Sequence, residues 1–168
     1  VNPQGYIREL MKVFSQNGGK FINAKVEDFG FQNKKISSVH TDNGNFECDI
    51  AIITAGIWSK ELMLKLGLNI PLEAERGYHV VYKNASILPR NPMMMTIGKF
   101  GVTPMGSDLR CAGTVELGGI KLGPSKAPIK LLRRRVAEAF PKMCYDKTEE
   151  WFGFRPTAPD SLPLIGQL

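Results

Sequence analysis

The segment 49–56, Asp-Ile-Ala-Ile-Ile-Thr-Ala-Gly, constrains the fold more than any other part of the chain. Its apolar residues are consecutive instead of alternating, which is typical of a strand buried on both faces, usually in a parallel sheet. The segment ends in Ala55-Gly56 and leads directly into a short predicted helix over 60–66. A buried strand, a turn of small residues and a helix make up half of a nucleotide-binding unit. A plain strand–helix turn explains the same pattern about equally well.

The residues before this unit predict a helix followed by a β-meander. Asn2 is a favoured helix N-cap and Pro3 a favoured first residue, and Gly18-Gly19 supplies a helix stop. Extended segments then follow over 26–48, with a strong hairpin signal at Asp42-Asn43-Gly44-Asn45.

The residues after this unit predict a second sheet. Alternation places Tyr78, Val80 and Tyr82 on one face of a strand. The predicted strands cover 76–82, 93–97, 100–105, 109–115 and 150–155, and one helix over 125–140 interrupts them. We therefore expect an antiparallel sheet with one main helix.

Charge and reactive side chains exclude several classes of protein. The 168 residues carry a net charge of +6, which suggests an anionic partner, but the charges are scattered. The one tight cluster, 133–135, would point in three directions from a helix, so no nucleic-acid partner is expected. A basic binding module is kept as the non-enzymatic alternative. Three widely spaced cysteines and two histidines indicate neither a disulfide framework nor a metal site. With no membrane span or signal peptide visible, we expect a cytoplasmic location.

The segment 151–156, Trp-Phe-Gly-Phe-Arg-Pro, contains the best candidate for binding chemistry. Gly153 stands between bulky aromatic residues, where glycine weakens a strand unless something must come close to the backbone. Pro156 forces Arg155 into an extended conformation, so the guanidinium is presented from a rigid backbone. A planar five-donor group held in this way suits bidentate binding of a carboxylate. A structural salt bridge with Asp160 is an equally weighted interpretation.

Four motifs, in order, resemble the FAD-dependent D-amino-acid oxidase and dehydrogenase family. Residues 151–166 are similar to its late pattern Trp-x-Gly-x-Arg-Pro-x-Thr-Pro-Asp-x-x-Pro-x-Ile-Gly, with Ala158 where that pattern has Thr. The other three motifs are 49–59, 76–78 and 110–116. The bacterial dehydrogenases are the most similar branch, and the resemblance covers only the middle and late portion of the family's chain. It therefore implies a fragment that is inactive alone and holds FAD weakly.

The resemblance also implies a fold class and a division into domains. The class is α+β, with part of an FAD-binding βα domain and a mostly antiparallel substrate domain that has one main helix. Residues 1–69 would form the partial FAD-binding domain and residues 70–148 the substrate-binding domain. Residues 149–168 would return as a strand and loop toward the flavin.

The same resemblance implies roles for individual residues. Arg155 would bind the substrate carboxylate, and Tyr78 would lie near the site with its hydroxyl as a second donor. Arg110 would be either another carboxylate-binding arginine or a structural one. The residues implied to border the cofactor are Val26, whose backbone would meet the adenine, and Ala55, Gly56 and Trp58; we add Gly153 to this cofactor-binding set. The implied reaction is hydride transfer from a D-amino acid to FAD, giving an imino acid and then a 2-oxo acid and ammonia. A glycine- or sarcosine-type amine oxidase is the alternative within the family, and the electron acceptor and peripheral membrane association of the full-length enzyme are left open.

Two further residues receive structural interpretations. His79 alternates away from Tyr78 and is expected to be a packed or surface residue instead of a catalytic one. Cys111 lies beside Arg110, but a buried strand thiol is the preferred interpretation.

Overall fold

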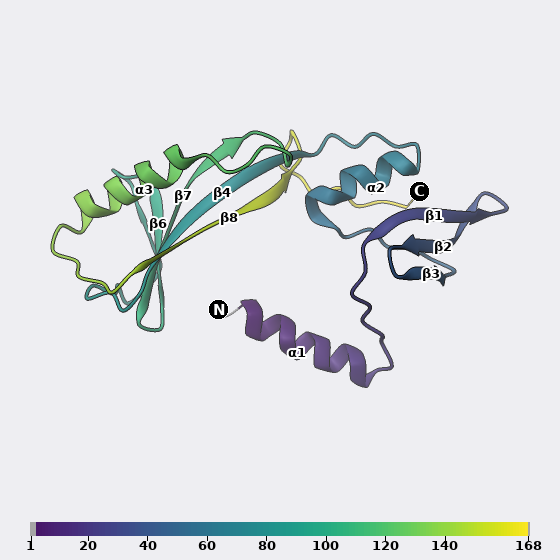
Figure 1. Ribbon diagram of the computed structural model, residues 1–168, viewed down its shortest axis with the longest axis horizontal. Coiled ribbons are helices and arrows are strands. Elements are labelled where there is room, and N and C mark those ends of the chain that lie inside the picture. The colour runs from purple at the N-terminus through teal and green to yellow at the C-terminus, as the bar shows by residue number, and fades with distance from the viewer. Residues whose placement is uncertain (1–2, 168) are drawn as a thin grey trace. The chain divides into compact units, whose positions relative to one another are not determined.

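The computed structural model describes residues 3–167, and the predicted N-cap Asn2 lies outside that range. The chain divides into two compact units, Val1–Ile53 and Thr54–Leu168. The described residues contain three α-helices and two antiparallel sheets, which confirms the predicted α+β class (Figure 1). The segment 54–69, which we assigned to the FAD-binding domain, clusters with the large sheet in the second unit.

The first unit consists of a helix and the predicted meander. Helix α1 spans Pro3–Gln16, and the sheet has the order β1-β2-β3, with strands Val26–Gln32, Lys35–Thr41 and Gly44–Glu47. The turn between β1 and β2 places Asn33 and Lys34 at φ 50° and 64°, as tight two-residue hairpin turns require. No described residue of α1 is buried, and its apolar residues Tyr6, Leu10 and Phe14 are 63%, 51% and 48% exposed.

The predicted buried strand over 49–54 is wrong for this structure. The segment forms no strand, and the side chains of Ile50 and Ile52 are 79% and 82% exposed. A parallel strand is stable only between neighbouring strands, and none of the described strands pairs with this segment. The turn that follows does form, as a short 3-10 helix η1 (Gly56–Trp58) leading into helix α2 (Ser59–Lys65).

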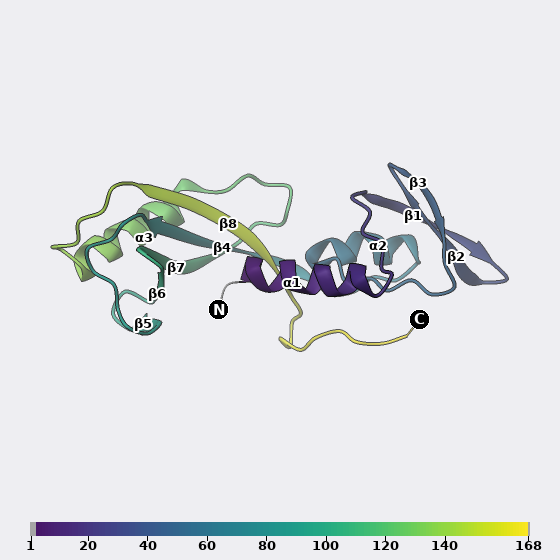
Figure 2. The ribbon, with the colours of Figure 1, turned by 90° about the horizontal axis from the view of Figure 1, so that it is seen from below.

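The second unit is built on a five-stranded antiparallel sheet. Its strand order is β5-β6-β7-β4-β8, which places the last strand, with its proline, at an edge where a missing N–H is tolerated. Helix α3 (Lys126–Ala139) lies along one face of this sheet, with Ser125 as its N-cap (Figures 1 and 2). The strands are β4 (Glu73–Tyr82), β5 (Met93–Met95), β6 (Phe100–Met105), β7 (Asp108–Leu117) and β8 (Thr148–Thr157).

The core lies between α3 and the sheet. The three alternating residues of β4 predicted to share a face are all buried there, with side chains 3%, 0% and 3% exposed for Tyr78, Val80 and Tyr82. They pack with apolar residues of α3, Ile129, Leu132 and Val136. Because residues alternate along a strand, the neighbours of these three project from the opposite face, which α3 does not cover. We call this opposite side the open face.

A β-bulge in β7 decides which side chains reach the open face. Gly77 pairs with Val115 and Tyr78 with Gly113, so Thr114 is an extra residue, and its φ is 72°. Such a φ is strained for a β-branched residue. The inserted residue reverses the alternation beyond it, so Glu116 points to the helix-covered face instead of joining Arg110 on the open face.

Candidate functional site

A small cavity lies on the open face of the large sheet, over the middle of β4. Its volume is about 220 Å³, which is below the roughly 300–1,000 Å³ typical of ligand pockets. Three strands supply its lining, because β7 and β8 flank β4 on either side. The lining residues are Gly77, Tyr78, His79, Arg110, Ala112, Trp151, Gly153, Phe154 and Arg155.

Arg155 reaches this cavity from β8. Its backbone pairs with Glu75, but its guanidinium lies over Gly77, where an added Cβ would be 3.4 Å from Nη2 and 3.5 Å from Cζ. Within residues 3–167 no acidic side chain forms an ion pair with Arg155, and the carboxylate of Asp160 instead accepts from Leu162 N at 3.0 Å. The structural salt bridge considered from the sequence is therefore not formed, and Arg155, an exposed residue, borders the cavity without an acidic partner among the described residues.

Arg110 enters the same cavity from β7. Its Nη2 donates to Nδ1 of His79 at 3.2 Å, and the imidazole stacks on the indole of Trp151 with ring centres 4.7 Å apart. Burial, with the charge of Arg110 as a second cause, lowers the pKa of His79 to about 4. His79 is therefore neutral at physiological pH and accepts through Nδ1. The interpretation of His79 as a packed side chain holds, but its place in the cavity wall was not foreseen.

Gly153 leaves room for a side chain of its own strand. An added Cβ would overlap the indole of Trp151, with Cη2 the nearest atom and Cζ2 and Cζ3 both at 2.8 Å. The close approach inferred from the sequence therefore exists, and in the structure its occupant is an aromatic ring. The role of Gly153 in cofactor binding remains a proposal.

This overlap gives a test of the cavity wall. We expect Gly153→Ala to displace the indole of Trp151 and to break its stacking on His79, changing the near-ultraviolet circular dichroism and the tryptophan emission. Gly101→Ala is the matched control, because a Cβ there meets only the Ala112 carbonyl oxygen, at 3.7 Å. Identical spectra for the two variants would contradict the described wall.

Tyr78 does not present its hydroxyl to the cavity, so the expected second donor is corrected. Its side chain lies on the helix-covered face, where the hydroxyl donates to Glu116 and accepts from Ser125 N at 3.1 Å. The physical reason is alternation, since Tyr78 shares the face of Val80. Only its strand position borders the cavity.

Sequence reasoning missed Arg76, which is 1% exposed. Its Nη1 donates to Glu116 Oε2 at 2.7 Å and to the Gly123 carbonyl at 2.8 Å. Its Nη2 donates to the Gly119 carbonyl at 3.2 Å and to that of Leu122. The available signal was its position, two residues before Tyr78 and therefore on the buried face. Hydrogen bonds from Tyr78 and Arg76 lower the pKa of Glu116.

The Ala55-Gly56 corner is the second element of interest. Gly56 has φ +57° and open space where a Cβ would lie, so a ligand can approach its backbone. Ile57 is buried, whereas Trp58 is 53% exposed and contacts Phe154 of β8 edge-on, with ring centres 6.4 Å apart. Open backbone beside an exposed indole fits a planar aromatic cofactor. Val26, at the start of β1, pairs with Thr41 in the first unit.

The remaining reactive groups have structural surroundings. Cys111 is 0% exposed, which confirms the buried strand thiol, and this burial raises its pKa to about 12. Arg133 binds Glu150 at 2.8 Å. Residues 3–167 contain no cluster of three or more His, Cys, Asp or Glu side chains placed to hold a metal ion. No helix in the same range combines the length and apolar character of a membrane span.

A family model and two relatives both point to oxidoreductases. The model of the family described as FAD dependent oxidoreductase matches residues 1–168. A D-amino-acid oxidase of Bradyrhizobium diazoefficiens is 36% identical over 169 residues, which are 98% of this chain and 40% of the relative. A D-amino acid dehydrogenase of Vibrio vulnificus is 31% identical over 166 residues, 96% of this chain and 40% of the relative. The chain thus spans about 40% of the length of these relatives.

Solved structures show the same fold. A glycine oxidase from Geobacillus kaustophilus superposes with a TM-score of 0.76 at 21% identity, covering 92% of this chain and 42% of that chain. An L-proline dehydrogenase from P. horikoshii gives a TM-score of 0.74 at 21% identity, covering 92% and 43%.

Proposed function

Because the chain belongs to the FAD-dependent oxidoreductase family, we propose that its protein oxidises D-amino acids whose carboxylate is bound by Arg155. The observation that carries this proposal is the Arg155 guanidinium, which faces a cavity of about 220 Å³ without an acidic partner among the described residues. Two relatives named for D-amino-acid oxidation, at 36% and 31% identity, support the choice of substrate. The products would be imino acids, which water converts to 2-oxo acids and ammonia.

The contribution of this chain is orientation. Arg155 would hold the carboxylate through two parallel N–H···O bonds, which fix both the position and the plane of the bound group. Gly77 leaves the space in which the guanidinium lies, and Pro156 keeps the backbone of Arg155 extended. FAD would supply the chemistry of accepting a hydride. Holding a substrate in one reactive orientation is worth up to roughly 7–11 kcal/mol in favourable cases.

Several chain segments would serve the cofactor. The open backbone of Gly56, its neighbour Ala55 and the exposed indole of Trp58 would border the flavin cofactor. Val26 would meet the adenine through its backbone. Gly153, where the absence of a Cβ leaves room for the Trp151 indole, would also border the cofactor. We further propose that 1–69 serve the FAD, 70–148 the substrate, and 149–168 return to the flavin.

The direct test uses the complete protein with FAD bound, under anaerobic conditions. We expect D-alanine to abolish the visible absorbance of oxidised flavin, while L-alanine leaves it unchanged. Glycine and sarcosine form the second arm, because a solved structure of similar fold is a glycine oxidase. Reduction by glycine alone would move the substrate assignment to that class. Failure of every amino acid to reduce the flavin would contradict the proposed function.

A further inference from the structure

Arg110 is the second arginine of the cavity, and carboxylate binding by Arg155 leaves it without a role. Its side chain is half-buried, and its Nη2 donates a hydrogen bond to His79 Nδ1 at 3.2 Å. Across residues 3–167 no acidic side chain forms an ion pair with Arg110. Since a guanidinium carries five donors and stays charged, Arg110 keeps donors available for an anion.

His79 and Trp151 hold Arg110 in place without neutralising it. The imidazole is fixed by stacking on the indole, with an interplanar angle of 20°. Its lowered pKa, about 4, keeps it uncharged, so it orients Arg110 as a neutral acceptor. The arrangement positions a positive charge while leaving that charge unpaired.

The two guanidinium groups converge along β4. The backbone of Arg155 pairs with Glu75, but its guanidinium lies over Gly77, two residues further along β4. The backbone of Arg110 pairs with Val81, but its guanidinium donates a hydrogen bond to His79, two residues nearer to Gly77 along β4. The positions of β4 beneath the two guanidinium groups, Gly77 and His79, are therefore only two residues apart, about 7 Å. A short molecule with an anionic group at each end fits this spacing.

The acidic residues of this face leave the pair of charges uncompensated. Two acidic residues share the face of Arg110: Glu149 forms an ion pair with Lys147 at 3.2 Å, and Asp108 forms one with Lys83. Glu75 lies opposite Arg155, but no ion pair joins them in the described structure. The bulge at Thr114 turns Glu116 to the other side of the sheet. Two positive charges thus face one cavity, a combination that calls for a ligand with two negative groups.

We propose that Arg110 is a specificity residue that binds a second acidic group, so that this cavity prefers dicarboxylic amino acids such as aspartate and glutamate. The proposal rests on the proposed function for the role of Arg155 and extends it to the substrate's side chain. Because Arg110 would contact the side chain and not the reacting carbon, it sets the choice of substrate.

The test isolates the effect of the second acidic group by comparing two ligands that differ only in that group. Succinate and butyrate have chains of equal length, and only succinate has a carboxylate at both ends. With the complete FAD-bound protein, we expect calorimetry to give a dissociation constant about 10- to 100-fold lower for succinate. Arg110→Met should reduce this preference to less than about 3-fold while changing butyrate binding little.

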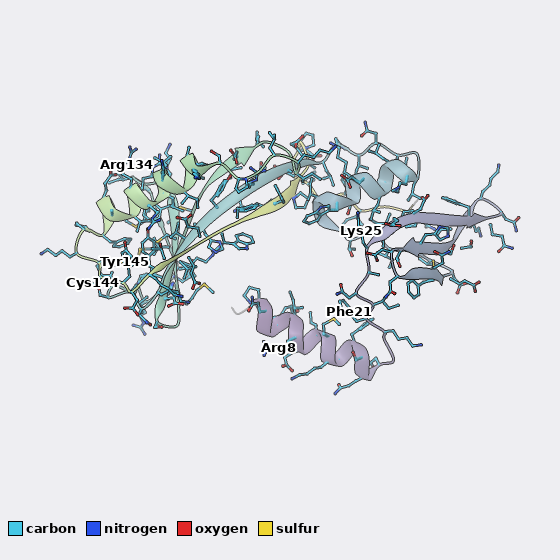
Figure 3. The ribbon with its side chains drawn as sticks, viewed as in Figure 1. Arg8, Phe21, Lys25, Arg134, Cys144 and Tyr145 are labelled. Atoms are coloured by element: carbon cyan, nitrogen blue, oxygen red, sulfur yellow. The ribbon has the colours of Figure 1, made fainter. Side chains whose placement is uncertain are left out.

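Two further variants complete the test. Arg110→Lys keeps the charge but loses the planar donor arrangement, so it should retain part of the preference. Arg134→Met is the control, because Arg134 lies on α3, 70% exposed and ion-paired with Glu138 at 3.6 Å (Figure 3); it should leave both ligands unaffected. Unchanged circular dichroism shows that each variant is folded.

The outcomes distinguish this inference from the proposed function. A wild-type protein that binds butyrate as tightly as succinate overturns the role of Arg110, as does an Arg110→Met variant that retains the preference. An equal loss for both ligands would mean that the two arginines share one carboxylate, which also overturns it. If succinate is preferred through Arg110 but no amino acid reduces the flavin, the assignment of Arg110 to a second acidic group stands and the proposed function fails.

Discussion

Replacing Arg155 by leucine is expected to lower kcat/KM for the amino-acid substrate by about 100- to 1000-fold. The estimate follows from two hydrogen bonds to a charged group, at about 1.5–3 kcal/mol each, with part of the loss offset by water entering the cavity. The fold should survive, because the guanidinium is exposed, contacts the bare backbone of Gly77, and has no acidic partner in the described chain. Steady-state kinetics and a thermal melt of the same preparation measure both effects.

Two companion variants give this prediction its specificity. Arg155→Lys should recover part of the loss, since a point charge still attracts the carboxylate but cannot bind it in parallel. Gly77→Val should mimic the loss by pushing the Arg155 guanidinium from its place. An Arg155→Leu enzyme with kinetics within about 3-fold of wild type would remove Arg155 from the binding site.

Replacing Arg76 by methionine is expected to damage stability more than any other single change of an arginine in this chain. The substitution removes every donor that Arg76 gives to Glu116 and to the carbonyls of 119–123, the segment that joins β7 to α3. Charged and polar groups left unpaired in a buried site are strongly destabilising. We expect a thermal midpoint lower by about 10 °C or more, or a loss of soluble protein.

Arg133→Met is the matched control for this prediction. Arg133 also binds a glutamate, Glu150 at 2.8 Å, but its side chain is 44% exposed. Exposed ion pairs contribute little to stability, so the midpoint should change by no more than about 2 °C. Equal midpoints for the two variants would show that the Arg76 network does not hold the sheet to its following loop.

Local patterns predicted most of the second unit. Alternation at Tyr78, Val80 and Tyr82 identified the core face, and the apolar spacing over 125–140 identified α3, because both patterns depend on burial against an element of the same unit. The segment 49–54 shows the opposite case. Consecutive apolar residues indicate a need for burial, but they do not supply the neighbouring strands that a parallel strand requires.

The candidate site was predicted in part. The motif around Arg155 indicated a presented guanidinium, and the structure places it in a cavity. Alternation alone predicts that the Tyr78 hydroxyl lies outside that cavity, because Tyr78 is on the same face of β4 as Val80. The bulge could not be inferred, because Thr114 is a residue type that rarely adopts a positive φ. With the bulge unknown, the side of the sheet taken by Glu116 was also unknown.

The most direct test of the account compares propionate with propionamide, two ligands of equal shape of which only propionate carries a charge. Calorimetry on the complete FAD-bound protein should show propionate bound about 100-fold more tightly by wild type. The Arg155→Leu variant should lose most of this preference and keep only the part that Arg110, in the same cavity, supplies. An undiminished preference for propionate in that variant would contradict the claim that Arg155 binds the substrate's carboxylate.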